Sequence, residues 1–197
     1  MTSPRIATIV LAAGSSTRMP EGHKLLEIID GRPIVEWAVQ AAVDSGTDPV
    51  VVVTGHRAED VEEILPAGAT VLRSPDFSEG LSASLRCGLE ALPPEIEAVV
   101  VALGDMPFVR ARHHRALIGA WRPGSIVVPT RDGRRGHPVV WSASFFDEMA
   151  TLSGDQGAKS IAIRHPEAVI EVAALDDAGF VDIDDAGDLE RARAHDS

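Results

Sequence analysis

Hydrophobic residues along the chain alternate between short continuous runs and runs with helical spacing. Residues 6–11 and 99–103 are apolar at nearly every position, which is typical of strands buried on both faces. Between Pro33 and Gly46, apolar side chains recur every three or four residues and predict a helix whose buried stripe includes Trp37. The same patterns predict strands at 50–53, 69–72, 126–128, 138–141 and 169–172, helices at 58–65, 82–92 and from 186, one helix before 126 and two after 141.

This order of elements predicts an α/β fold with a mostly parallel sheet covered by helices on both faces. No internal repeat, linker or low-complexity tract interrupts the chain, so we expect a single domain over residues 1–197. In doubly wound sheets, ligands bind outside the carboxyl ends of the strands. The segments that follow each predicted strand are therefore the places to look for function.

Composition narrows the class of partner. The chain has 30 acidic and 18 basic residues, a net charge of −12, which argues against a nucleic-acid or anionic-membrane surface. The single cysteine, Cys87, cannot form an internal disulfide, and no Cys/His cluster suggests zinc. No secretory signal and no apolar run of about 20 residues is present, so we expect a cytoplasmic protein without a membrane span.

The loop after the first strand carries the first candidate site. Its small residues let the backbone approach an anion, and Arg18 and Lys24 add two cations, as a polyphosphate requires. Lys24 is one of only two lysines in the chain. The spacing fits neither a dinucleotide-binding GxGxxG loop nor a P-loop, and a solvated turn is the alternative. The candidate nucleotide-binding residues here are Leu11, Ala12, Ala13, Gly14, Ser15, Arg18 and Lys24.

Acidic residues supply the second candidate site. Asp105 follows the strand at 99–103, and beside a triphosphate its carboxylate would hold Mg²⁺. The alternative is that Asp105 only caps a turn. Residues 182–185 read Asp-Ile-Asp-Asp before the last helix, where acids also suit a helix N-terminus.

The strings LAAGSSTRM, KLL and GDMP resemble the motifs of the MobA-like NTP transferases, within the Rossmann-like nucleotidyltransferases. The resemblance implies that the first loop, together with Gly104, holds a nucleoside triphosphate. It also implies that Arg18 and Lys24 contact the phosphates and that Asp105 binds Mg²⁺. DIDDAGDL is similar to the closing motif of the family, which implies that Asp184 is a second metal ligand. GLSASL resembles the helix that faces the base and ribose, which implies a contact from Ser82. The loop from Arg18 to Lys24 is one residue longer than is usual in the family.

Two later strings indicate a branch. RRGHPV and GDQGAK resemble motifs of the molybdenum cofactor cytidylyltransferases, where this region receives the pterin substrate, with Lys159 in place of the usual arginine. The implied acceptor-binding residues are His137, Asp155, Gly157 and Lys159. The Ala13-Gly14 pair favours CTP over GTP, because the guanylyl branch more often has two glycines there. We therefore expect an in-line transfer of CMP from CTP to a phosphate acceptor of the molybdopterin type, with release of pyrophosphate. A molybdoenzyme or its maturation factor is a possible protein partner.

Other functions fit the same sequence. Within the class, the nucleotide could be GTP, or the acceptor a sugar or polyol phosphate. An NAD(P)-dependent oxidoreductase is a second class, which the missing GxGxxG motif disfavours. A non-catalytic cofactor-binding chaperone is the third, and the lengthened loop and the altered DIDDAGDL string are its support.

Overall fold

A computed structural model of the protein describes residues 4–14, 23–154 and 157–194. Its strands are β1 (Ile6–Ala12), β2 (Ile28–Ile29), β3 (Arg32–Pro33), β4 (Val50–Thr54), β5 (Thr70–Arg73), β6 (Ala98–Leu103), β7 (Ile126–Arg131), β8 (Arg134–Arg135), β9 (Val139–Ser142) and β10 (Val169–Ala173). Its helices are α1 (Ile34–Val43), α2 (Ala58–Glu62), α3 (Leu81–Glu90), α4 (Ala111–Ala120), α5 (Phe146–Ala150), α6 (Lys159–Arg164) and α7 (Ala186–Ala194).

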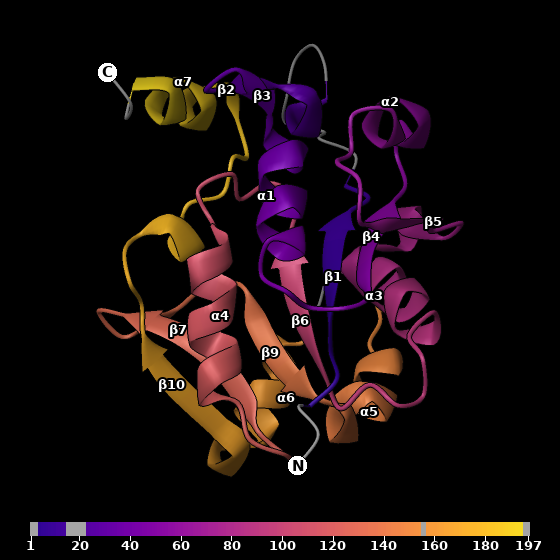
Figure 1. The fold of residues 1–197 in the computed structure, drawn as a ribbon, viewed down its shortest axis with the longest axis vertical. Coiled ribbons are helices and arrows are strands. Elements are labelled where there is room, and N and C mark those ends of the chain that lie inside the picture. Colours follow the sequence, from indigo (N-terminus) through magenta and orange to yellow (C-terminus); the bar gives the residue numbers. More distant parts are fainter. Residues whose placement is uncertain (1–3, 15–22, 155–156, 195–197) are drawn as a thin grey trace.

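One large twisted sheet organises the molecule (Figure 1). Its strands follow the order β10-β7-β9-β6-β1-β4-β5, and the short β8 pairs with β7. The neighbouring pairs are parallel except where β9 runs antiparallel to both β6 and β7, and β8 antiparallel to β7. Because β9 is reversed, the loop that precedes it lies at the same edge of the sheet as the loops that follow β1 and β6.

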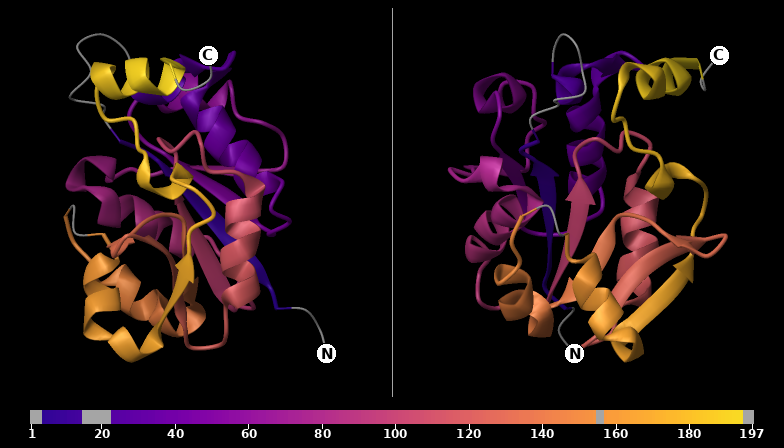
Figure 2. Two further views of the ribbon diagram at one scale, coloured as in Figure 1. Left: turned by 90° about the vertical axis from the view of Figure 1, so that its left-hand side faces the viewer. Right: turned by 180° about the vertical axis from the view of Figure 1, so that it is seen from behind.

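Helices cover both faces of the sheet, as the apolar strands require (Figure 2). Neighbouring residues of β1 point to opposite sides: Ile9 packs into the cluster that includes α3, α5 and α6, and Val10 into the cluster that includes α1 and α7. Helix α4 covers β6, β7 and β9 on the α1 side. Gly88 lets α3 lie close to the sheet, since a Cβ there would stand 2.9 Å from a methyl group of Ile9.

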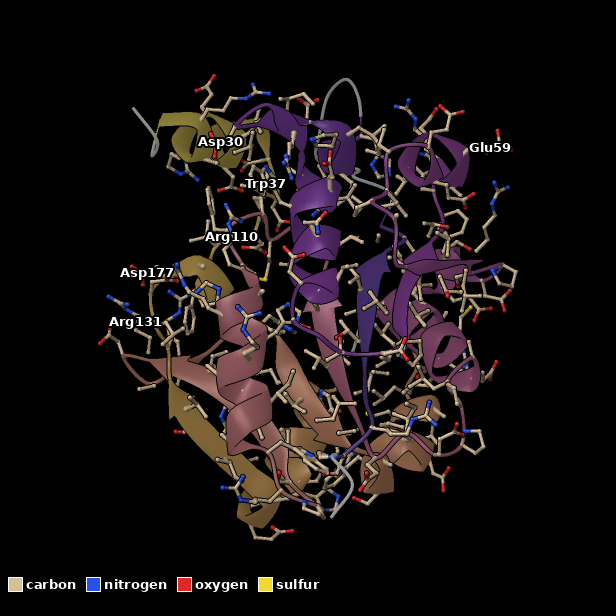
Figure 3. The ribbon with its side chains drawn as sticks, in the orientation of Figure 1. Asp30, Trp37, Glu59, Arg110, Arg131 and Asp177 are labelled. Atoms are coloured by element: carbon tan, nitrogen blue, oxygen red, sulfur yellow. The ribbon has the colours of Figure 1, made fainter. Side chains whose placement is uncertain are left out.

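The predicted fold class is confirmed, and every predicted strand and helix is present with small shifts at its ends. The helix expected over 58–65 ends earlier, at Glu62. Trp37 is not part of the buried stripe of α1. Its indole is half-buried, donates a hydrogen bond of 2.9 Å to the Ile29 carbonyl, and contacts the Arg32 and Arg110 guanidinium groups (Figure 3).

No helix in the described part of the chain combines the length and the apolar character that crossing a membrane requires.

Candidate active site

A cleft of about 620 Å³ opens at the carboxyl ends of β1 and β6. Residues from the first loop, from α3 and from both acidic motifs line it: Leu11, Ala12, Ala13, Gly14, Lys24, Leu25, Phe77, Ser78, Gly80, Leu81, Ser84, Leu103, Asp105 and Asp184. The structure thus brings together most of the predicted nucleotide-binding residues and both predicted metal ligands. Ser15 and Arg18 lie outside the described residues.

Lys24 is the centre of the charged part of this cleft. Its Nζ donates hydrogen bonds to Asp105 Oδ2 at 2.7 Å and to Asp184 Oδ1 at 2.9 Å. The 3₁₀ turn Lys24–Leu26 presents the ammonium, with Leu25 buried beneath it. Three segments that are far apart in the sequence therefore meet at one ion cluster.

The electrostatics of the cluster keep Lys24 charged. Burial by itself lowers the pKa of Lys24, but the charges and hydrogen bonds of Asp105 and Asp184 outweigh burial, and the net effect raises the pKa above its ordinary value. The ammonium therefore balances part of the carboxylate charge at neutral pH.

The two carboxylates also fit a divalent cation. Asp105 Oδ1 is buried and has no hydrogen-bond partner among the described residues, so one lone-pair-bearing oxygen at the cleft is unused. In the part of the chain that the structure describes, no cluster of three or more His, Cys, Asp or Glu side chains could share a metal ion. Two carboxylates alone suit Mg²⁺, which is usually held by one or two carboxylates together with water and substrate phosphates.

Backbone packing holds the Asp105 loop against the first loop. The Gly104 N–H donates to the Leu11 carbonyl at 2.9 Å, and a Cβ on Gly104 would stand 3.1 Å from that oxygen. From the other side, the Ile183 N–H donates to the Asp105 carbonyl at 3.1 Å, and the Ile183 side chain is fully buried. Gly104 therefore acts through close packing, and the structure places it behind the cleft lining.

The structure places Ser82 away from the cleft lining. Ser82 is buried, and its Oγ donates to the Gly154 carbonyl at 2.6 Å, which joins the start of α3 to the loop before α6. Ser84, two positions later, lines the cleft instead. Sequence reasoning found the helix, and the contact from Ser82 to the base or ribose stays a prediction; in the structure its hydroxyl is directed to the loop before α6.

The residue before Lys24, His23, belongs to a group of aromatic rings. His23 is buried, its ring stacks on His56 with centroids 5.6 Å apart, and His56 contacts Phe77, which lines the cleft. Burial, and next the neighbouring His56, lower the pKa of His23. His23 therefore adds no positive charge beside Lys24 at neutral pH. The sequence contained no motif that pointed to this stack.

A second, apolar pocket of about 150 Å³ adjoins the cleft and shares Leu11, Leu81 and Leu103 with it. We call it the inner pocket. Its walls come from β6, β7, β9, α3 and α6, and the predicted acceptor residues His137, Gly157 and Lys159 all line it. The other lining residues are Leu85, Val101, Val128, Arg135, Gly136, Val139, Trp141, Ala158 and Ala162. Asp155 lies outside the described residues.

His137 presents a neutral imidazole to the inner pocket. Its Nδ1 is buried and has no hydrogen-bond partner among the described residues, and burial lowers the pKa of the ring. Its backbone N–H donates to the Gly179 carbonyl at 2.9 Å. Sequence reasoning found His137 but missed Trp141 and Leu85, because pocket walls and core residues have the same apolar character.

Comparison with known proteins decides the family. The model of the MobA-like NTP transferase domain matches residues 8–169. The chain belongs to this family. The fold that this family shares is also found in a solved nucleotidyl transferase.

Two relatives of the chain have names that describe different activities. A bifunctional protein GlmU from Pelobacter propionicus is 32% identical over 149 residues, which are 75% of this chain and 32% of GlmU. The chain thus spans about a third of the length of that relative. A nicotine blue oxidoreductase from Paenarthrobacter nicotinovorans is 30% identical over 95% of this chain and 96% of that protein.

Solved structures agree with the family. A nucleotidyl transferase from Methanothermobacter superposes with a TM-score of 0.87 at 27% identity, covering 98% of both chains. A Mycobacterium tuberculosis protein in complex with manganese superposes with a TM-score of 0.79 at 26% identity, covering 98% of this chain and 100% of that one. Nucleotidyltransferases of this type use a divalent metal.

Proposed function

We propose that this nucleotidyltransferase moves the CMP group of CTP to the phosphate of a molybdopterin-type acceptor and releases pyrophosphate. The observation that carries the proposal is the arrangement of the two cavities. The charged cleft, with Lys24 between Asp105 and Asp184, shares three leucines with an apolar pocket that is lined by His137 and Lys159. A triphosphate suits the first cavity, and the ring system of a heterocyclic acceptor suits the second.

The roles of the residues follow from this placement. Mg²⁺ held by Asp105 and Asp184 would supply charge neutralisation for the phosphates. Lys24, and Arg18 as the resemblance implies, bind the β- and γ-phosphates and stabilise the charge that develops on pyrophosphate. His137 and Lys159 orient the acceptor so that its phosphate oxygen lies in line with the α-phosphorus. No protein nucleophile takes part, because the acceptor phosphate itself attacks.

The preference for CTP rests on the Ala13-Gly14 pair, since the guanylyl branch that the chain resembles more often has two glycines there. A Cβ on the neighbouring Gly55 would stand 2.8 Å from the Ala13 Cβ and 2.6 Å from the Phe77 Cβ, so these groups are closely packed. This packing fixes the position of Ala13, which lines the cleft.

A second candidate is reduction of an aromatic heterocycle by a nicotinamide cofactor. The nearly full-length match to nicotine blue oxidoreductase favours it, and so do the apolar walls of the inner pocket. The acceptor pocket could hold either kind of ring. The paired carboxylates beside Lys24 favour the transferase, because a hydride transfer has no need of a divalent metal there.

One screen separates the candidates. Purified protein is incubated with Mg²⁺ and each of CTP, GTP, ATP and UTP, with and without molybdopterin, and pyrophosphate is measured. We expect release with CTP and molybdopterin only, and none after Mg²⁺ is chelated. Release with a different pair redefines the substrates, and oxidation of NADH or NADPH by a heterocyclic dye, with no pyrophosphate, supports the oxidoreductase. Binding of molybdopterin without any turnover supports the chaperone.

A further inference from the structure

The segment after β10 connects the inner pocket with the charged cleft. We call residues 176–184 the strap. It contacts three different parts of the molecule along its length: the start of α4, the loop that carries His137, and the loop that carries Asp105. None of the sequence motifs pointed to its first half.

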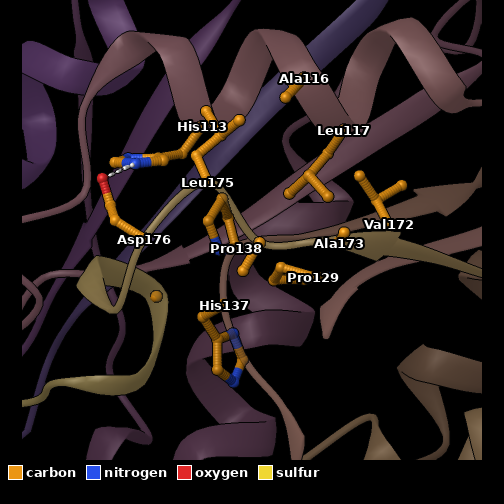
Figure 4. Close-up of a pocket in the computed structure, with 12 residues that line it drawn as sticks. His113, Ala116, Leu117, Pro129, His137, Pro138, Val172, Ala173, Leu175 and Asp176 are labelled. Atoms are coloured by element: carbon orange, nitrogen blue, oxygen red, sulfur yellow. Dashed lines mark hydrogen bonds and ion pairs between the residues drawn. The ribbon is translucent and has the colours of Figure 1, made fainter. Parts of the chain in front are cut away.

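The first contact anchors the strap to α4 through Asp176 (Figure 4). Asp176 Oδ2 accepts hydrogen bonds from Arg112 Nη2 at 2.7 Å and from His113 Nε2 at 3.1 Å, while Oδ1 accepts from the Ala178 N–H at 2.9 Å. His113 Nδ1 already accepts from the Arg110 N–H at 2.8 Å, so a neutral His113 carries its proton on Nε2 and donates it to Asp176.

Asp176 remains ionised in this setting. Burial by itself raises the pKa of Asp176, but the hydrogen bonds from the Ala178 N–H, Arg112 and His113 outweigh burial and lower the pKa to about 2. Arg112, His113 and the Ala178 N–H therefore all donate to an ionised carboxylate.

The second contact joins the strap to the loop of His137. The Gly179 carbonyl accepts the His137 N–H at 2.9 Å. A Cβ on Gly179 would clash with the His137 carbonyl oxygen, and a Cβ on Gly136 would clash with the Gly179 carbonyl oxygen. The two loops therefore cross in direct backbone contact, and neither can shift without moving the other.

The third contact reaches the ion cluster. The Ile183 N–H donates to the Asp105 carbonyl at 3.1 Å, and the next residue, Asp184, accepts from Lys24. Only five positions separate Gly179 from Asp184. A displacement at the His137 loop is therefore passed directly to the second carboxylate of the cleft.

We propose that Asp176 is a positioning residue that fixes the strap on α4 and thereby holds His137 of the inner pocket and Asp184 of the cleft in one arrangement. This inference rests on the proposed function for the meaning of the two cavities. Asp176 lies outside both cavities, and its role in this proposal is to fix the position of the acceptor site relative to the nucleotide site.

The test is Asp176→Asn, with Asp177→Asn as its matched control. The asparagine amide keeps the shape but has a single acceptor oxygen, so its NH2 group must face either the Ala178 N–H or the Arg112 and His113 donors. On the same strap, the exposed side chain of Asp177 forms an ion pair with Arg131 at 2.9 Å (Figure 3). Without any ligand, we expect the His137 and Ile183 amides of Asp176→Asn to exchange with deuterium about tenfold faster. Mn²⁺ affinity, measured by paramagnetic resonance, should fall about fivefold. Asp177→Asn should match the wild type in both measurements.

Unchanged exchange and unchanged Mn²⁺ affinity in Asp176→Asn would overturn the proposal, and so would equal changes in Asp177→Asn. If Asp176→Asn does not fold, Arg112→Gln replaces it, because it removes one donor and leaves the carboxylate; smaller changes in the same direction support the proposal, and none overturns it. Neither measurement needs an acceptor or turnover. Failure of the substrate screen therefore leaves this test intact, and failure here leaves the transfer reaction intact.

Discussion

The charged cleft and the inner pocket share three leucines but are built on different physical principles. In the cleft, polar groups from remote segments are held by opposite charge, and Lys24 joins two carboxylates. In the inner pocket, the walls are core side chains such as Trp141 and Leu85, and the imidazole of His137 is neutral, with an Nδ1 that has no hydrogen-bond partner among the described residues. The cleft is thus organised to manage charge and the pocket to recognise shape, which predicts that a substitution in one cavity should leave the other largely unaffected as long as the strap contacts of His137 and Asp184 are kept.

The largest effect should come from the cleft carboxylate. We expect Asp105→Ala to reduce metal-dependent transfer by about 1,000-fold, since charge neutralisation at the phosphates is lost. The fold should persist, because Lys24 retains Asp184 as a partner. Turnover is measured by pyrophosphate release and folding by thermal unfolding. Asp60→Asn, an exposed carboxylate paired with Arg57, is the control. Wild-type turnover in Asp105→Ala would remove the metal assignment.

Lys24→Met should separate metal binding from catalysis. Turnover should fall about 100-fold, because the leaving pyrophosphate loses a cation. Mn²⁺ should nevertheless bind the free protein about tenfold more tightly, since the ammonium no longer competes for Asp105 and Asp184. The raised pKa of Lys24 means that raising the pH to 9 cannot produce the same effect in the wild type. Weaker Mn²⁺ binding in the variant would contradict the view that the lysine and the metal share these oxygens.

A smaller effect is expected from filling the inner pocket. Ala158→Leu adds three carbon atoms to a pocket of about 150 Å³, so the KM for the acceptor should rise about tenfold. The affinity for CTP, measured by calorimetry, should not change. Ala150→Leu, at a half-buried position of α5 outside both cavities, is the control. An equal loss of CTP affinity would show that the two regions are not independent.

The smallest effect on activity, and a distinct effect on stability, should come from pH. Burial lowers the pKa of His114 from 6.5 to about 4, so the unfolded chain takes up a proton below pH 6.5 that the folded protein refuses. The free energy of unfolding should therefore fall by about 2 kcal/mol between pH 7 and pH 5 through this residue alone. Denaturant unfolding should show that His114→Leu loses this slope, whereas His165→Gln, at a side chain 36% exposed, keeps it.

Local patterns predicted the parts of the molecule that depend on neighbouring residues. The continuous apolar runs of β1 and β6 and the helical spacing of α1 were sufficient for the fold, and Asp105 followed from its position after a buried strand. The contact between Lys24 and Asp184 could not be predicted from spacing, because 160 positions separate the two residues.

Other parts depended on packing that leaves no local pattern. Ser82 and Ser84 cannot be told apart from the local sequence. Both are buried, but Ser82 Oγ donates to the Gly154 carbonyl, whereas Ser84 lines the cleft. Trp37 matched the apolar stripe of α1, but its indole N–H and large ring favoured the helix edge, where two guanidinium groups cover it. Asp176 lies in a segment without a motif, and its partners come from a helix more than 60 positions away.

Because strand β9 is antiparallel to its neighbours, one loop at the ligand edge of the sheet can vary in sequence and length. In a purely parallel sheet, every loop at the ligand edge must leave one strand and begin a crossover of fixed geometry. The connection from β7 to β9 is a hairpin that returns directly to the sheet, so it needs no crossover helix. The hairpin contains Arg135 and His137, which line the inner pocket. Its length and composition can change without disturbing any crossover helix or the first loop, provided that the backbone contacts of Gly136 and His137 with the strap are kept. Exchange of this hairpin between related chains is therefore a direct route to new acceptors on a constant nucleotide-handling frame.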